Sequence, residues 1–229
     1  GAGIGNSIAT ESVEKNYKDY MKFTFMYAWL SGWCTVCLFC LYQPFMYIWV
    51  GEKLLFPMLD VVLICIYFYS LTMGDVRSQY SAAIGLFWEN RVYVLVEAIA
   101  NIVLNYFLGK KFGVHGIIIA TWLSIFFINF GWGSSIIFKY YFVEYNKIEY
   151  YAKQMLYFLN TIIATVLTYV ITYHINGNIY VKLIGSAIVC MIVPNIYFLI
   201  VYYRTNIAKE SYDFIKTNIL VRLKRNKGV

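Results

Sequence analysis

Charged residues are scarce in this chain. Asp, Glu, Lys and Arg make up 14% of its 229 residues, whereas they make up about 25% of a typical soluble domain. Hydrophobic residues account for 61%, and the mean hydropathy is +0.60. This composition excludes an ordinary soluble domain, because a soluble core cannot absorb so much apolar surface.

Histidine is even scarcer, with only two residues, and the familiar catalytic motifs are missing. The sequence contains no HExxH, no GxSxG and no phosphate-binding loop with its lysine. Cys34-x2-Cys37-x2-Cys40 has a metal-like spacing, but it lies in an uncharged apolar run without a second pair, so we interpret these cysteines as packing residues. We expect no catalytic residues, no metal, no cofactor and no enzymatic activity.

Long apolar runs dominate the sequence. A helix rises ~1.5 Å per residue and needs roughly 20 apolar residues to cross a ~30 Å hydrocarbon core. Six runs approach or exceed this length: Phe23–Leu41, Phe56–Met73, Val92–Leu108, Val114–Phe138, Met155–Tyr173 and Ile184–Tyr203. Strands of a membrane barrel would instead alternate over segments of about ten residues. The sequence therefore predicts an all-α, polytopic transmembrane helix bundle with six spans.

The basic residues predict the orientation of the bundle. Six spans place both chain ends on one side, and fifteen of the 19 Lys and Arg residues fall on that side. Basic residues are retained in the cytoplasm, so we expect a multi-pass protein of the cell inner (plasma) membrane with both ends cytoplasmic. The net charge of +7 is spread over every inner loop, which does not indicate a nucleic-acid partner.

The chain divides into four segments. They are residues 1–22, the end of a truncated helix and a cytoplasmic loop; 23–138, four spans; 139–203, a cytoplasmic loop and two additional spans; and 204–229, a basic tail. The first nine residues are small and lack the basic start of a signal peptide, so we expect a fragment of a longer protein. In the tail, Tyr212, Ile215, Ile219 and Leu223 recur at helical spacing, which favours an amphipathic helix on the inner leaflet over a frayed polar tail.

Polar residues inside the apolar runs are the functional candidates, because each costs about 2.5–3.5 kcal/mol to insert when charged. Glu97, Asn101 and Asn105 are spaced i, i+4 and i+8, with Tyr93 one turn earlier, so they share one helix face. This face either lines a hydrophilic cavity or bonds to neighbouring helices. Both readings stay open for the asparagines, and we favour the cavity for Glu97. Glu97 is also the candidate proton or sodium site, because a low dielectric disfavours a charged carboxylate.

Two arginines flank the loop between the second and third runs. If the second helix continues to about residue 83, Arg77 faces an inward-opening vestibule. Arginine stays charged and binds phosphate through two parallel hydrogen bonds, so Arg77 and Arg91 suit a diphosphate-bearing substrate. The equally open alternative is that both only anchor the loop on the positive side. In the fourth run, Gly131 and Gly133 permit close helix approach or a local bend.

The third and fourth runs also carry a family pattern: Asn101-x3-Asn105, Gly113-x2-Gly116 and Ala120-Thr121. It resembles the multidrug/oligosaccharidyl-lipid/polysaccharide (MOP) flippase superfamily, and within it the bacterial polysaccharide transporters of the O-antigen flippase kind. Residues 5–23 look like the inner loop between the eighth and ninth helices of that family, and residues 82–91 like the loop between the tenth and eleventh. The similarity covers roughly the first 140 residues.

The resemblance implies the C-terminal part of a two-lobe transporter, with the six spans as its ninth to fourteenth helices. Such flippases move undecaprenyl-diphosphate-linked oligosaccharides across the inner membrane for O-antigen, capsule or other surface polysaccharides. Implied partners are the lipid bilayer, that lipid-linked oligosaccharide and other polysaccharide-assembly proteins. The implied substrate path includes Arg77, Arg91, Glu97, Asn101 and Asn105. Two alternatives are a drug/cation antiporter of the same superfamily and a membrane-embedded glycan polymerase.

Overall fold

The computed structural model describes residues 2–226, with side chains from residue 3 to 217, and every regular element within this range is helical. The elements are α1 (Ala2–Thr10), α2 (Val13–Val50), the short 3-10 helix η1 (Glu52–Leu54), α3 (Met58–Met73), α4 (Asp75–Ile84), α5 (Phe87–Phe112), α6 (Val114–Leu123), the π-helix η2 (Ser124–Trp132), α7 (Gly133–Tyr140), α8 (Lys147–Tyr173), α9 (Ile179–Tyr202) and α10 (Asn206–Asn226).

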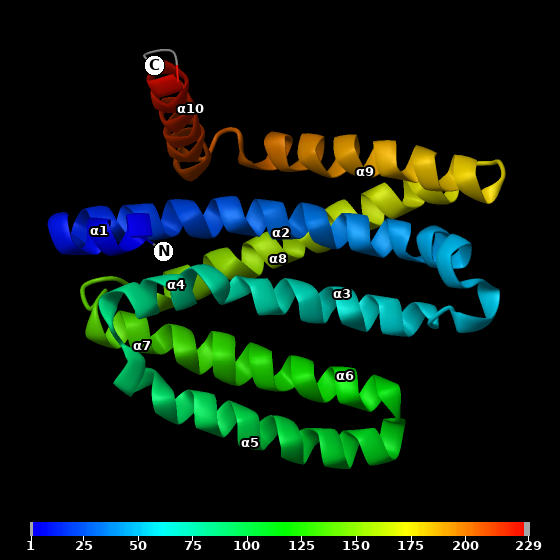
Figure 1. Ribbon diagram of the computed structural model, residues 1–229, viewed down its shortest axis with the longest axis horizontal. Helices are drawn as coiled ribbons and strands as arrows, with labels where there is room; N and C mark the ends of the chain where they lie inside the picture. The colour runs from blue at the N-terminus through cyan, green and yellow to red at the C-terminus, as the bar shows by residue number, and fades with distance from the viewer. Residues whose placement is uncertain (1, 227–229) are drawn as a thin grey trace.

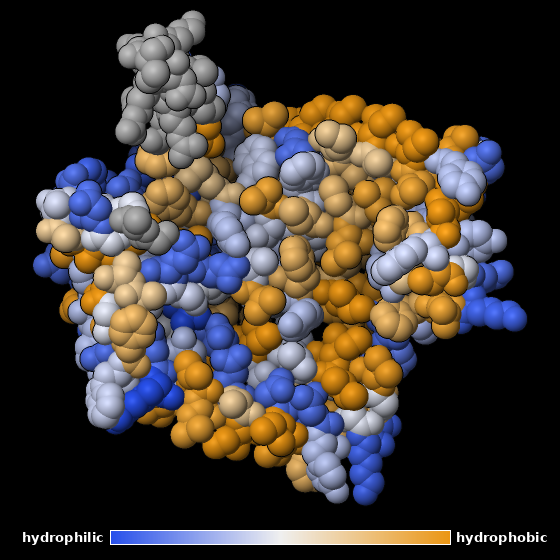
Figure 2. All heavy atoms as spheres, viewed as in Figure 1, coloured by the Kyte–Doolittle hydropathy of each residue, from blue (hydrophilic) through white to orange (hydrophobic). Residues whose placement is uncertain are grey.

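Six helical stretches in the described range are long and apolar enough to cross a membrane. They contain 24 to 38 residues each: Val13–Val50, Met58–Ile84, Phe87–Phe112, Val114–Tyr140, Lys147–Tyr173 and Ile179–Tyr202. On the visible face, apolar residues cover most of the middle and hydrophilic residues gather toward the two ends of the helices (Figure 2). The prediction of an all-α, multi-pass membrane bundle with six spans is confirmed.

The spans lie side by side with α2 in a central position (Figure 1). Helix α2 packs against α3 on one side and against α8 and α9 on the other. Beyond α3 come α6 and η2, and α5 forms the edge of the bundle by packing on them. Helices α1, α4, α7 and α10 all lie at the same end of the bundle. The two ends of the described chain therefore lie at one end of the bundle, as an even number of spans requires.

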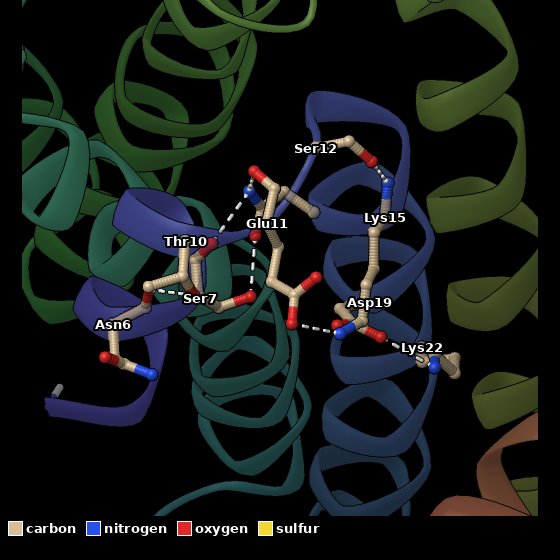
Figure 3. Close-up of polar contacts among 9 residues, drawn as sticks. Asn6, Ser7, Thr10, Glu11, Ser12, Lys15, Asp19 and Lys22 are labelled. Atoms are coloured by element: carbon tan, nitrogen blue, oxygen red, sulfur yellow. Dashed lines mark hydrogen bonds and ion pairs between the residues drawn. The ribbon is translucent and has the colours of Figure 1, made fainter.

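The predicted cytoplasmic loop before the first span is wrong, because residues 13–22 are the first turns of α2. Ser12 caps this helix by accepting a hydrogen bond from the backbone N–H of Lys15 at 3.3 Å. Lys15 also forms an ion pair with Glu11 at 2.6 Å, and a second pair follows one turn later (Figure 3). A good cap and paired charges extend the helix beyond its apolar part.

The second span continues past its apolar part, which was the condition set for placing Arg77 inside the bundle. Gly74 lies between α3 and α4 with φ −89° and ψ −10°, and the helix resumes at Asp75. Gly85, with φ +88°, then ends α4 in the left-handed conformation that favours glycine. This extension of one and a half turns beyond Ser78 places Arg77 inside the helix rather than in a loop.

The turn between α5 and α6 depends on two glycines of the predicted family pattern. Gly113 makes the turn with φ +61°. Gly116 faces α5 so closely that a Cβ atom would lie 2.0 Å from the carbonyl oxygen of Leu108. Any larger residue would separate the two helices here, because backbone atoms cannot yield as a flexible side chain can.

The fourth span changes its helical type in the middle. Residues 124–132 form η2, a π-helix that runs without a break from α6 into α7. Such wide turns are rare and occur frequently at functional sites. Helix η2 packs against α5 and α3, so it faces the same helices that carry the predicted polar residues.

The tail is helical over Asn206–Asn226, in agreement with the predicted helix. Figure 1 shows α10 turning steeply away from the direction of the spans. Tyr212 is 65% exposed and Ile215 46% exposed, while Phe214 packs edge-on against Phe23 of α2 with ring centroids 5.5 Å apart. The side chains of Ile219 and Leu223 lie outside the described range.

Candidate functional site

Arg77 on α4 is the buried residue around which the polar side chains of the bundle gather. Its side chain has no exposed surface. Nη1 donates to the hydroxyl of Tyr93 on α5 at 2.7 Å, and Nη2 donates to Oδ1 of Asn129 on η2 at 2.6 Å. Two glycines make room for it, because a Cβ on Gly133 would lie 2.7 Å from Nη1 and one on Gly74 would lie 3.1 Å from Nη2. Arg77 therefore joins three spans.

Asn129 connects Arg77 to Glu97. Its Nδ2 donates to Oε2 of Glu97 at 2.8 Å, while its Oδ1 accepts from Arg77. Arg77 and Glu97 form no direct ion pair. The guanidinium and the carboxylate are thus linked by an amide, whose oxygen accepts from the cation and whose NH2 group donates to the anion. We call Arg77, Tyr93, Glu97 and Asn129 the Arg77 network.

Asn101 and Asn105 extend the polar face of α5 toward the other end of the bundle. Asn105 donates to Oδ1 of Asn101 at 2.8 Å, and Asn101 donates to Oγ of Ser124 at 2.9 Å. Ser124 begins η2, and its hydroxyl donates to the carbonyl of Thr121. Of the two readings left open, the structure supports hydrogen bonding between helices for Asn101, whereas Asn105 bonds to Asn101 within α5.

Two predicted positions differ from expectation. Arg77 does not face an open vestibule, because its side chain has no exposed surface and lies against Gly74, Gly133 and Asn129. Arg91 does not join Arg77 either. It is exposed, and its guanidinium lies 3.3 Å from the ring centroid of Trp88 on the same helix. In this conformation the two arginines do not form a common phosphate clamp.

A second polar pair lies toward the opposite end of the bundle. Nδ1 of His115, at the start of α6, is in direct contact with Oδ1 of Asp60 near the start of α3. Asp60 is only 4% exposed, whereas the His115 side chain is 39% exposed. This pair satisfies a carboxylate that would otherwise be buried without a partner.

Two of the three cysteines of the first span pack in the apolar interior, and the third, Cys34, is half-buried. Cys37 and Cys40 lie in the cluster that α2 forms with α8 and α9, together with Cys190. All five cysteines are free thiols. The searched, described residues contain no group of three or more His, Cys, Asp or Glu side chains that could hold a metal ion.

The residues that the sequence reasoning missed are Asn129 and its neighbour Gly133 as partners of Arg77. Asn129 is the only amide in the apolar stretch SIFFINFGW. The same rule that singled out Glu97, a polar group at bilayer depth, would have found it. Its pairing with Arg77 could not be read from the sequence, because the two positions are 52 residues apart.

The fold and this site define a multi-pass membrane protein with a charged network inside its helix bundle. A scan against protein-family models finds no match for the chain, and searches of curated proteins and of solved structures find no significant match either.

Proposed function

We propose that the chain is the C-terminal part of a flippase that moves lipid-diphosphate-linked oligosaccharides across the inner membrane for surface polysaccharide synthesis. The observation that carries this proposal is Arg77, a permanently charged group with no exposed surface inside a membrane bundle. A buried cation is costly and in membrane proteins usually marks a substrate or ion pathway. An anionic substrate that moves through a membrane needs such a group.

The neutral character of the direct partners of Arg77 supports this function. Tyr93 and Asn129 hold the guanidinium through a hydroxyl and an amide oxygen, and neither carries a negative charge. A phosphate oxygen binds arginine more strongly than either of these groups, because both donor and acceptor are then charged. When the transporter opens toward the cytoplasm, we expect a phosphate group of the substrate to replace one of them.

The proposed orientation places the end of the bundle with α1, α4, α7 and α10 in the cytoplasm of a plasma membrane. Arg77 lies in α4 toward this end, which is the side on which lipid-linked precursors are assembled in the family that the sequence resembles. The basic residues around it favour this orientation. The proposal includes no enzymatic step.

The experiment compares Arg77→Ala, Arg77→Lys and Glu97→Gln in the full-length protein in its native strain. We expect Arg77→Ala and Glu97→Gln to reduce surface glycan at normal membrane levels of protein, with lipid-linked precursor accumulating inside. Arg77→Lys is expected to restore export only in part, because lysine cannot form two parallel bonds to phosphate. Arg91→Ala is the matched control, since Arg91 is exposed and outside the network.

Wild-type glycan levels in both Arg77→Ala and Glu97→Gln would contradict the proposal. Export of organic cations that persists when glycan synthesis is blocked would favour the drug/cation antiporter instead. Glycan chains that reach the surface but fail to lengthen would favour a polymerase.

A further inference from the structure

The charge of Arg77 is neutralised only at a distance. Its Nε is buried and has no hydrogen-bond partner, and both Nη atoms donate to uncharged groups. Buried charges in proteins are normally paired, because an unpaired one is very costly in a low dielectric. The negative charge of this network is the Glu97 carboxylate, which reaches Arg77 through Asn129.

The other charged and titratable groups around Arg77 leave Glu97 as the carboxylate of the network. Helix η2 has no titratable side chain. On α4, Asp75 accepts a hydrogen bond from the hydroxyl of Tyr27 at 2.8 Å. Three phenols face Arg77: Tyr20 of α2, Tyr93 of α5 and Tyr151 of α8. The helices that pack on α5 add His115 of α6, which contacts Asp60, and the exposed Lys139 of α7. The other charged residues of α5 lie outside the network: Glu89, Arg91, Lys110 and Lys111.

We propose that Arg77, Asn129 and Glu97 form one charge-exchange unit, in which a phosphate anion bound at Arg77 replaces Glu97 as the counter-charge and Glu97 takes up a proton. This inference rests on the proposed function, because it needs an anion to reach Arg77. It goes beyond that function by coupling substrate binding to proton binding, and it assigns the coupling to Asn129.

The exchange balances in charge and in atoms. At rest, the positive Arg77 and the negative Glu97 sum to zero. One phosphate group with one negative charge binds Nε and Nη2 through two of its oxygens and displaces Oδ1 of Asn129, which leaves one cation beside two anions. One proton taken up from the bulk solvent then adds to the Glu97 carboxylate, so that Arg77, Glu97 and this phosphate group again sum to zero charge. When the anion leaves, the proton leaves with it, and Asn129 again bridges the two side chains.

The free Nε gives the incoming anion a place to bind. An arginine offers Nε and one Nη as a pair of parallel donors to a single phosphate. Here Nε is unused, and Nη2 is engaged by an amide that is a weaker acceptor than phosphate. The network therefore needs one hydrogen bond to break, between Arg77 and Asn129, for the paired binding to form.

The test measures proton uptake during anion binding. The purified full chain in lipid nanodiscs is titrated with farnesyl diphosphate, in buffers of different ionisation enthalpy, by calorimetry. We expect the wild-type protein to take up about one proton more per bound ligand than Glu97→Gln. Relative to that variant, wild-type affinity should rise by up to about tenfold for each unit decrease in pH, because one additional proton is bound with each ligand. Subtracting Glu97→Gln removes the protonation of the probe itself.

Two further variants separate the parts of the unit. Asn129→Leu removes the bridge but leaves both charged residues. We expect this variant still to bind farnesyl diphosphate. Its proton uptake per bound ligand should be close to that of Glu97→Gln and below that of the wild type. Glu89→Gln is the matched control, because it makes the same change on α5 outside the network, and it should behave like the wild type. Thermal denaturation of each variant checks that it is folded.

The outcomes distinguish this inference from the function on which it rests. Binding that depends on Arg77, with equal proton uptake in the wild type and Glu97→Gln, would overturn the charge-exchange unit and leave the flippase proposal intact. The absence of binding, or binding that Arg77→Gln and Arg77→Lys both leave unchanged, would overturn the anion site and the inference with it.

Discussion

At the scale of single residues, the most constrained group is the guanidinium of Arg77. It is enclosed by two glycines, Gly74 and Gly133, and by the side chains of Tyr93 and Asn129. The close approach of α7 to α4 at Gly133 leaves no space for another atom. The Arg77 network thus depends on the absence of a Cβ atom at Gly133 as much as on its polar groups.

We therefore expect Gly133→Ala to lower the melting temperature of the protein in detergent. The added Cβ would lie 2.7 Å from Nη1 of Arg77 and 3.1 Å from Cζ of Tyr93, which forces apart a bonded pair in a packed interior. Overpacking of this kind costs about 1–3 kcal/mol. The measurement is thermal unfolding of the purified variant, followed by its circular dichroism.

Gly131→Ala is the control for this prediction. The same substitution two residues earlier places the new Cβ 3.4 Å from the carbonyl oxygen of Phe126 and near no part of the network. We expect a smaller change there. If both substitutions lowered the melting temperature equally, the loss would come from replacing any glycine in this helix. It would then not come from the contact of residue 133 with Arg77.

At the scale of helices, α2 is the element that holds the bundle together. It packs on α8 and α9 through Gly32, whose Cβ, if present, would lie 2.6 Å from Oγ1 of Thr161 and 3.1 Å from Cζ of Phe198. Small residues let membrane helices approach closely, because packing drives their association in lipid. Trp29 adds a hydrogen bond to Asn195 of α9 at 2.9 Å.

Gly32→Val is expected to loosen the last two spans from the rest of the bundle. The larger side chain overlaps both Thr161 and Phe198, so α8 and α9 must shift away from α2. We expect faster protease cleavage in residues 203–205, between α9 and α10, together with a lower melting temperature. Leu30→Val, at a 49% exposed position on the same helix, is the control. Unchanged cleavage in Gly32→Val would contradict the packing at this position.

The helices also show which parts of the sequence reasoning succeed. The number and helical nature of the spans follow from the length of the apolar runs. The extension of the second span past Gly74 was considered as a possibility, and the structure shows it. The start of α2 was not, because Ser12 and the ion pair of Glu11 with Lys15 stabilise a helix in a polar segment. Neither the apolar run nor the glycines of the fourth span predict its π-helix.

At the scale of the whole molecule, the even number of spans and the uneven distribution of basic residues predict the orientation. Both ends of the described chain lie at one end of the bundle, and fifteen of the 19 Lys and Arg residues are assigned to that side. The positive-inside rule then predicts which end is cytoplasmic.

Cysteine accessibility tests this orientation. Glu144→Cys lies in the connection between α7 and α8, and Asn176→Cys in the connection between α8 and α9, and both positions are exposed. In intact cells, a membrane-impermeant maleimide should label Asn176→Cys and should label Glu144→Cys only after permeabilisation. The unmodified chain corrects for its native thiols. The reverse pattern would show that the basic end lies outside.

The sequence by itself determined the six spans, the helical fold and the sidedness of charge, because each depends on local composition and on the thickness of a bilayer. It also supplied Glu97, Asn101 and Asn105 on one face, since helical periodicity relates residues of a single segment. Only the tertiary structure decided that Asn129 joins Arg77 to Glu97 and that His115 contacts Asp60. The physical reason is that these contacts cross between helices, whose mutual rotation and depth are set by packing and not by any periodicity within one span.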